Sequence, residues 1–277
     1  MNHCSLRCSY CADVIRNGSA RLPDIRHCVD AVKQIRDHCD NQGFQSADFY
    51  ITGGEVTEWP LLPELIAVID DLGGNSRIRS NGQSELKIYD EIWRHLDAIT
   101  LEFHPESAAT AHFAQVIAAA IKNSVEVSVT VMMTPERWEE LESWTVKIKT
   151  LWNDLPVNKR LLFANPVINT EPLAYSESQL AALINQTGDL EYWQDDQMIT
   201  TDFAALAVHQ LNRFSGSRCA AGLEQIVIDA WGKVYRGHCR QGGKLGEIGS
   251  EIKFPSEPRI CDRPICNNGF DINATKY

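Results

Sequence analysis

Cys4-Ser-Leu-Arg-Cys8-Ser-Tyr-Cys11 places three thiols within eight residues, separated by three and then by two residues. This spacing is too tight for a disulfide framework and lacks the paired symmetry of a zinc knuckle. It suits an iron–sulfur cluster, because three thiolates would hold the cluster and leave one iron open to bind another molecule. Taken alone, the triad also allows a structural metal site or surface thiols.

This stretch resembles the radical S-adenosylmethionine (SAM) superfamily, whose hallmark is three cysteines at this separation with an aromatic residue before the last. Here that residue is Tyr10, and the sequence from Asn2 to Cys11 also looks like the one common in the superfamily. The resemblance implies that Cys4, Cys8 and Cys11 hold a [4Fe–4S] cluster, whose fourth iron chelates the amino and carboxylate groups of SAM. It also implies that Tyr10 belongs to the SAM site, and that one electron from the cluster cleaves SAM to methionine and a 5′-deoxyadenosyl radical.

Length and charge exclude several classes of protein. A chain of 277 residues that is 44% hydrophobic can form one large α/β domain with a small appendage. The net charge of −11 argues against nucleic acid as a partner, since phosphate contacts need a basic face. The longest apolar runs, such as 113–121, are far shorter than a bilayer span, and cysteines stand where a signal peptide would be apolar. We therefore expect a cytoplasmic enzyme without a membrane partner.

The nine cysteines gather toward the two ends of the chain. Without an export signal they indicate thiolate ligands in a reducing compartment rather than disulfides. Cys28 and Cys39 fall on the apolar stripe of a helix predicted from Pro23 onward. We expect these two to be buried as small hydrophobes and leave them out of the site.

Gly53-Gly54-Glu55 follows a segment, 47–52, that reads as a buried strand. By itself the tripeptide indicates only a strand-to-helix turn. Placed some forty residues after the triad, it resembles the radical SAM motif that receives the amino group of SAM. Glycines let the backbone approach a ligand, and a carboxylate accepts hydrogen bonds from an ammonium group. We therefore predict that Gly53, Gly54 and Glu55 bind SAM.

Strands and helices alternate along most of the chain. Such alternation predicts a parallel sheet with right-handed crossovers, hence a barrel or a doubly wound fold. The family resemblance selects an α/β fold with a partial (β/α)6 TIM-like barrel, open on one side, and a small C-terminal cluster-binding β-hairpin extension. The predicted strands are 47–52, 77–80, 98–103, 125–133 and 160–167, and the predicted helices are 61–72, 84–96, 108–122, 135–152, 178–184 and 202–214.

Polar residues end the middle strands of this pattern. Because ligands of barrels lie at the carboxyl ends of the strands, these residues are candidates for contact with SAM or substrate. The predicted pocket residues are Ser80, Asn81, Glu102 and His104. An ordinary turn role is equally open for each of them. Further strand ends fall at 133–134, 165 and 169.

Only three residues precede Cys4, whereas a radical SAM barrel normally begins with a strand ahead of its first cysteine. Either the first strand is nearly missing or the native start lies upstream of Met1, and we expect the second.

The C-terminal part of the sequence carries a second group of cysteines. The segment 225–235 predicts a β-hairpin, with apolar alternation before a turn at 229–232. One cysteine lies beyond each end of the hairpin and two more follow, so that four thiols are available for a fully protein-coordinated cluster. The predicted ligands are Cys219, Cys239, Cys261 and Cys266.

This segment resembles the auxiliary-cluster extensions called SPASM and twitch domains. Six residues rather than four separate Gly232 from Cys239, and later cysteines are too few for two extra clusters, so it fits the shorter twitch type with one auxiliary [4Fe–4S] cluster. A four-cysteine zinc ribbon is the alternative, although its usual two tight Cys-x-x-Cys pairs are missing. Either Cys261 or Cys266 is a candidate spare thiol, which would leave an open site for substrate.

Together the motifs indicate a radical SAM partial barrel core over 1–170, a helical connecting segment over 171–214 and a twitch- or SPASM-like cluster domain over 215–277. The resemblance implies an oxidoreductase or maturase that takes electrons from a flavodoxin or ferredoxin and abstracts hydrogen from a small molecule or a peptide. Its auxiliary cluster would accept the substrate electron or anchor the substrate. The alternatives are a non-catalytic iron–sulfur electron carrier and a zinc-binding interaction module. The turn at 53–55 argues against an electron carrier, which has no need of a SAM site.

Overall fold

The computed structural model describes residues 2–12, 15, 22–165, 171–186, 190–194 and 196–277. The chain divides into two compact units, Met1–Leu162 and Phe163–Tyr277. Within the described residues, no helix combines the length and apolar character that crossing a membrane requires. The three-part division proposed from the sequence stays a prediction.

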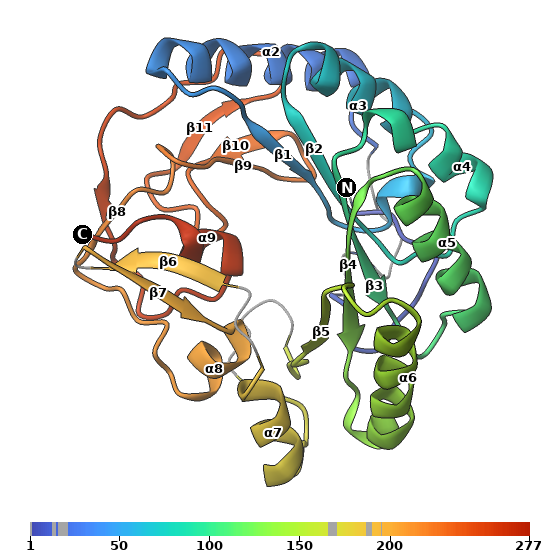
Figure 1. The fold of residues 1–277 in the computed structure, drawn as a ribbon. Coiled ribbons are helices and arrows are strands. Elements are labelled where there is room, and N and C mark those ends of the chain that lie inside the picture. Colours follow the sequence, from blue (N-terminus) through green and yellow to red (C-terminus); the bar gives the residue numbers. More distant parts are fainter. Residues whose placement is uncertain (1, 13–14, 16–21, 166–170, 187–189, 195) are drawn as a thin grey trace. The chain divides into compact units, whose positions relative to one another are not determined.

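The first unit is built on a parallel sheet with helices along one side (Figure 1). Its five strands pair in sequence order: β1 (Asp48–Ile51), β2 (Asn75–Ser80), β3 (Ala98–Phe103), β4 (Glu126–Met132) and β5 (Val157–Arg160). The helices are α2 (Ile25–Gln42), α3 (Leu62–Asp71), α4 (Leu86–Asp90), α5 (Thr110–Lys122) and α6 (Trp138–Leu151), with 3₁₀ turns η1 (Val56–Glu58), η2 (Trp93–His95) and η3 (Pro135–Arg137). The alternation predicted from the sequence is confirmed.

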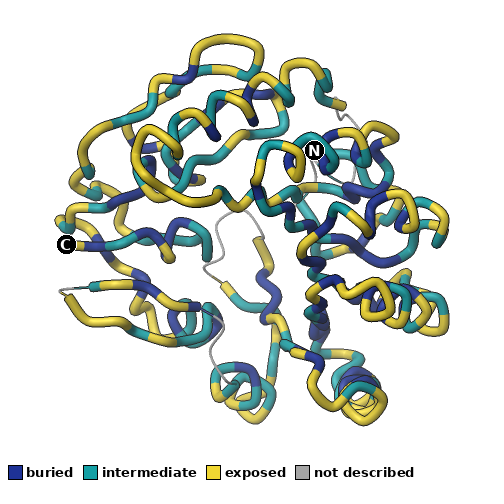
Figure 2. The backbone as a smooth tube through the Cα atoms, turned by 45° about the horizontal axis from the view of Figure 1, so that its top comes forward, coloured by how far each residue is buried: buried dark blue, intermediate teal, exposed yellow. Residues whose placement is uncertain are grey.

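The two faces of this sheet differ in chemistry, because side chains alternate along a strand. Leu101 and Phe103 of β3 are buried, and Phe103 stacks on Trp144 of α6 with ring centroids 3.9 Å apart. Thr100 lies on the opposite face, where its hydroxyl oxygen is 3.0 Å from that of Ser128. Figure 2 shows buried residues recurring along the chain with more exposed ones between them. The helix-covered face therefore forms the core, and the other face is polar.

Helix α2 begins where its sequence predicts, directly after Asp24. Asp24 caps its first turn by accepting the Arg26 N–H, and Gly43 ends it with a left-handed φ of 80°. Cys28 and Cys39, expected to be buried, are partly buried on this helix.

The predicted strand at 160–167 is wrong, because β5 spans Val157–Arg160. Pairing with β4 sets its position, with Val129 opposite Val157 and Met132 opposite Arg160. The apolar residues at 161–163 suggested a strand, and they are indeed buried, but they lie outside the hydrogen-bonded ladder. A segment can be buried without pairing with a neighbouring strand, so burial alone does not make it a strand. Asn165 consequently ends no strand, and Asn169 lies outside the described residues.

Two predicted helices are shorter than expected. The segment 84–96 forms α4 and the separate turn η2. The segment 202–214 forms only α8 (Phe203–Val208), and Gln210 beyond it takes a left-handed φ of 54°, which a continuing α-helix does not allow.

The second unit consists of small antiparallel sheets and short helices. The paired strands are β6 (Leu190–Gln194) with β7 (Gln197–Thr201), β8 (Arg218–Cys219) with β12 (Arg259–Ile260), and β9 (Val227–Ile228) with β10 (Lys233–Tyr235) and β11 (Lys244–Glu247). Its other helices are α7 (Glu177–Ile184) and α9 (Gly269–Asn273). A small core contains Leu190, Tyr192, Leu206, Phe214 and Ile272. The predicted hairpin is confirmed as β9 and β10, with Gly232 in the turn at a φ of 80°.

Candidate metal centres

The triad loop lies against the turn that follows β1. The backbone N–H of Glu55 donates to the carbonyl oxygen of His3 at 2.6 Å, one residue before the first cysteine of the triad. The approach is so close that a Cβ on Gly54 would stand 1.8 Å from the same oxygen. Glycine is therefore required at this position by the contact between the two loops.

Two carboxylates anchor the loop at the residues that follow its first two cysteines. Glu58 accepts the Ser5 N–H at 2.9 Å. Glu106, just beyond β3, accepts the Ser9 N–H at 2.7 Å and the Ser9 hydroxyl as well. Hydrogen bonds to a charged acceptor are among the strong ones, so these two side chains hold the path of the loop.

The end of β2 contributes Asn81 to the same place. Its side-chain amide donates to Cys4 Sγ at 3.8 Å, and its backbone N–H donates to Glu55 Oε2 at 2.6 Å. Ser80 is buried instead, with its hydroxyl 2.9 Å from the Tyr89 hydroxyl. Asn81 is thus beside the triad, whereas the contacts of Ser80 support the strand end.

Glu55 joins the turn after β1 to the end of β2. Its carboxylate is 2% exposed, and besides Asn81 it accepts the Thr57 N–H at 3.1 Å and the Thr57 hydroxyl at 2.6 Å. Burial raises the pKa of this carboxyl, against the effect of these hydrogen bonds. Contact with SAM stays a prediction.

Tyr10 and His104 lie together, and Glu102 has two cationic partners. The Tyr10 hydroxyl is 3.1 Å from His104 Nδ1, with the rings stacked at a centroid distance of 5.9 Å. Burial lowers the pKa of His104, which favours its neutral form. Burial alone would raise the pKa of Glu102, but Arg79 and Arg160, at 3.1 and 3.6 Å, lower it overall.

Two of the triad thiols, Cys4 and Cys8, need a cation to become thiolates near neutral pH. Burial raises the pKa of Cys4 to about 11, and Glu55 and Glu58 add to this effect. Burial also raises the pKa of Cys8. A metal deprotonates the thiols that coordinate it, so buried thiols beside carboxylates fit a metal cluster better than surface cysteines.

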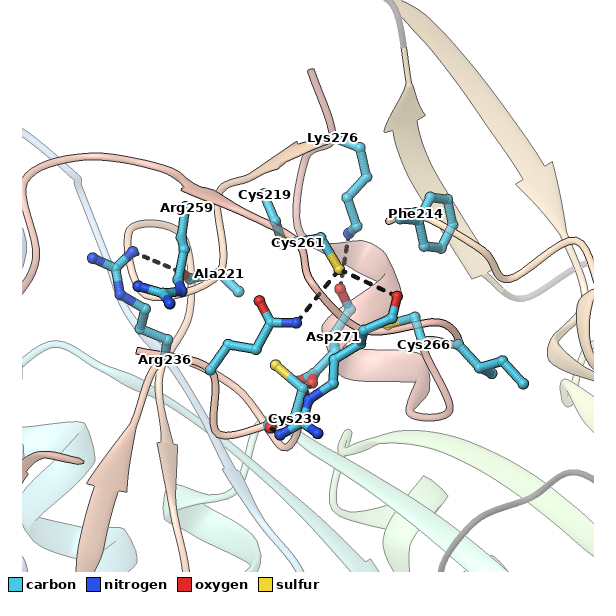
Figure 3. A pocket seen from close by; sticks show the side chains of 13 residues that line it. Phe214, Cys219, Ala221, Arg236, Cys239, Arg259, Cys261, Cys266, Asp271 and Lys276 are labelled. Atoms are coloured by element: carbon cyan, nitrogen blue, oxygen red, sulfur yellow. Dashed lines mark hydrogen bonds between the residues drawn. The ribbon is translucent and has the colours of Figure 1, made fainter. Parts of the chain in front are cut away.

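In the second unit, the other four predicted ligands line one cavity. Its empty volume is about 470 Å³, part of it open to solvent. Figure 3 shows Cys219, Cys239, Cys261 and Cys266 around this space. Thiols spread around a cavity fit a cluster, in which each thiolate binds its own iron.

Chain segments far apart in the sequence bring these thiols together. In the ladder of β8 and β12, Cys219 lies opposite Arg259, which places Cys261 just beyond the same pairing. The Cys266 N–H donates to the Asn212 carbonyl oxygen at 2.8 Å. The hairpin β9–β10 leads the chain to Cys239 but does not itself pair with the other cysteine segments.

Asp271 of α9 holds the loop that carries Cys239. Its carboxylate is 3% exposed and accepts the His238 N–H and the Cys239 N–H, each at 2.8 Å. A Cβ on Gly237 would stand 2.7 Å from the same carboxylate. Burial raises the pKa of Cys239 to about 11 and that of Cys266 to about 12, so these thiols also need a cation to ionise.

Lys276 is a buried cation at the edge of the cavity. Its side chain is 2% exposed, and its Nζ donates to the carbonyl oxygens of Asp271 at 2.9 Å, Ile272 at 3.1 Å and Ala274. Nζ also lies 5.0 Å from the centroid of the Phe214 ring.

The sequence patterns did not identify the side chains that hold the two groups of cysteine loops in place. Glu58 and Glu106 had a weak signal, since each lies a few residues beyond a predicted strand end. Asp271 and Lys276 had none, because nothing in their local pattern points to cysteines elsewhere in the chain. Within the ranges that the structure describes, no three His, Cys, Asp or Glu side chains converge closely enough to hold a single metal ion.

Comparison with known proteins gives a likeness of fold. No protein-family model matches the chain, and no curated protein does. Native anSMEcpe with bound AdoMet and Cp18Cys peptide has a TM-score of 0.59 at 16% identity, over 91% of this chain and 76% of that one. Native anSMEcpe with bound AdoMet has a TM-score of 0.56 at 14% identity, over 90% and 76%. Streptococcus suis SuiB bound to precursor peptide SuiA has a TM-score of 0.54 at 15% identity, over 92% and 61%.

These neighbours are radical SAM enzymes with SPASM or twitch domains, so the resemblance drawn from the sequence is confirmed at the level of fold. The predicted α/β partial barrel with a small C-terminal extension is confirmed in the same sense. The two anSMEcpe structures hold AdoMet, and what this chain shares with them is the fold.

Proposed function

We propose that this protein is a radical SAM enzyme with one twitch-type auxiliary [4Fe–4S] cluster. The observation that carries the proposal is the contact between the cysteine triad loop and the Gly54-Glu55 turn, in which Glu55 N–H donates to His3. Two motifs that the sequence linked only by family resemblance are neighbours at the carboxyl ends of parallel strands. Ligands of barrel folds bind at this edge.

Cys4, Cys8 and Cys11 would hold the first cluster. When bound, the cluster and SAM supply a one-electron cleavage that yields methionine and a 5′-deoxyadenosyl radical, which takes a hydrogen atom from the substrate. The contribution of the chain is to position the loop, through Glu58 and Glu106. The residues proposed to surround SAM are Tyr10, Gly53, Gly54, Glu55, Ser80, Asn81, Glu102 and His104.

Within this site the contacts of Glu102 and His104 suggest different roles for these two residues. Glu102 offers acceptor oxygens for hydroxyl groups, and Arg79 and Arg160 beside it offer donors for a carboxylate. His104, neutral and paired with the Tyr10 hydroxyl, can accept or donate a hydrogen bond without carrying charge into a buried place.

In the second unit, Cys219, Cys239, Cys261 and Cys266 would hold an auxiliary [4Fe–4S] cluster that accepts the substrate electron or anchors the substrate. A zinc site is the competing assignment for these thiols. The segments 1–170, 171–214 and 215–277 are proposed as the barrel core, the connector and the cluster domain.

The proposed substrate is a peptide, because two of the similar structures hold one, the Cp18Cys peptide and precursor peptide SuiA. A small metabolite is the alternative. The proposed reductant is a flavodoxin or a ferredoxin. We infer a reducing, cytoplasmic location, in which the cysteines of the two proposed sites stay available as thiolate ligands.

Anaerobic reconstitution with iron counting and a SAM cleavage assay tests the proposal. We expect about eight irons per chain, falling by about four when Cys4, Cys8 and Cys11 are all replaced by Ala. Methionine and 5′-deoxyadenosine should form only with the intact triad and a strong reductant. A non-catalytic iron–sulfur carrier would bind iron and leave SAM intact. A colourless protein that binds zinc would overturn the assignment.

A further inference from the structure

The cavity that holds four thiols is surrounded by cations, although the chain as a whole carries a net charge of −11. The charged side chains lining it are Arg236, Arg259, Arg263, Lys276 and the single carboxylate Asp271. Around the cavity positive side chains outnumber negative ones, whereas in the whole chain negative side chains are in excess. The overall composition therefore does not account for the cations that line the cavity.

Lys276 is the buried cation of this group, as Asp271 is its buried anion. Arg259 and Arg263 are exposed and Arg236 is partly exposed, so solvent screens their charges. The amino group of Lys276 uses all three donors of an ammonium on backbone carbonyl oxygens, and Phe214 covers it on one side. Its charge is therefore held in place, in surroundings where electrostatic interactions are stronger than in water.

Gln241 adds a hydrogen bond to sulfur. Its side-chain nitrogen donates to Cys261 Sγ at 3.6 Å, and its Oε1 accepts the Asp262 N–H at 3.4 Å. The second contact determines the orientation of the amide, because only with the oxygen toward Asp262 does the nitrogen face the thiol. A hydrogen bond to a ligand sulfur stabilises added negative charge on a cluster.

We propose that Lys276 is a tuning residue that raises the reduction potential of the cluster held by the four thiols, and that Gln241 adds to this effect. This inference rests on the proposed function, specifically on the auxiliary cluster. Reduction adds negative charge to a group already surrounded by thiolates, and the potential of such clusters follows the charges and sulfur hydrogen bonds around them. Of the two roles considered for this cluster, the arrangement favours electron acceptance.

A redox titration monitored by electron paramagnetic resonance tests the inference. It uses the full-length chain in which the triad cysteines are all replaced by Ala, so that only the C-terminal cluster contributes. Lys276→Met should raise the ratio of oxidised to reduced cluster at a fixed potential about tenfold, equivalent to a midpoint about 59 mV lower for a one-electron couple. Lys276→Arg should keep the parent midpoint, and Gln241→Leu should lower it by a smaller amount.

Lys233→Gln is the matched control, because Lys233 is an exposed cation of the same unit that does not line the cavity. Its midpoint should equal that of the parent. Should Lys276→Met fail to fold, Lys276→Gln carries the test, because its uncharged amide still offers donors for the backbone carbonyl oxygens, and its midpoint must be lower. About four irons per chain with unchanged midpoints overturn the inference alone. Absence of iron from this background overturns the auxiliary cluster in the proposed function and the inference with it.

Discussion

Replacing Asp271 by Asn tests whether one carboxylate organises the loop that carries Cys239. In the folded chain its two oxygens accept the His238 and Cys239 N–H groups, both at 2.8 Å. Asn keeps one acceptor oxygen and presents an NH₂ group to the other backbone donor. One N–H then loses its partner at a side chain that is 3% exposed.

The expected cost follows from these contacts. An unsatisfied buried donor costs about 1–3 kcal/mol, and the remaining hydrogen bond becomes weaker because its acceptor is no longer charged. Since about 1.4 kcal/mol is a factor of ten in an equilibrium constant, the ordered form of the loop should become roughly tenfold to a hundredfold less favoured. We therefore expect Asp271→Asn to lower both the free energy of unfolding and the retention of iron.

Two measurements check this expectation. Urea unfolding of the metal-free chain, followed by tryptophan fluorescence, gives the change in unfolding free energy. Iron per chain after gel filtration, measured with the triad cysteines replaced by Ala, should fall clearly below the roughly four irons of the parent. Asp262→Asn is the control, because Asp262 is exposed and its carboxylate has no role in the proposed loop. If the two variants behave alike in both assays, Asp271 does not organise the site.

Three further predictions concern the first unit. Gly54→Ala should remove about four irons per chain while leaving those of the C-terminal site, because its Cβ would stand 1.8 Å from the His3 carbonyl oxygen; unchanged iron would contradict this contact. Glu106→Ala should lower triad iron retention more than Glu106→Gln, because Gln keeps an acceptor for the Ser9 N–H; equal retention would show that this anchor is dispensable. Glu102→Gln should lose less unfolding free energy than the parent as the pH falls below 4.5. The folded pKa of Glu102 lies below its ordinary 4.5, so its contribution is complete above pH 4.5 and is lost as pH falls through the folded pKa. Identical pH profiles of unfolding free energy for Glu102→Gln and the parent would refute this.

Local signals allowed much of the fold to be predicted. The alternation of strands and helices, the hairpin with its turn at 229–232 and the start of α2 after Asp24 each depend on a few neighbouring residues. Side-chain period, turn chemistry and capping act over that same short range. The spacing of the triad is likewise a local property, which is why the sequence alone is enough to propose a metal cluster there.

Strand position is where local signals failed. The apolar run at 161–163 predicted the fifth strand, but β5 ends at Arg160 because its register is set by hydrogen bonds to β4. Pairing with a partner strand is invisible in the sequence of one segment. Candidate pocket residues that depended on this strand, such as Asn165, were misplaced for the same reason.

By itself, the sequence determined which cysteines are proposed to bind metal and where most of the helices and strands lie. The tertiary structure alone decided what holds those cysteines in place. Glu106 reaches Ser9 across 97 residues, and Asp271 reaches Cys239 across 32. Acidic side chains are ordinarily solvated, and no local pattern marks the few that accept hydrogen bonds from backbone donors of a distant loop. Such pairs form because folding brings unsatisfied N–H groups beside a carboxylate that can accept them, and only three-dimensional proximity selects the partners.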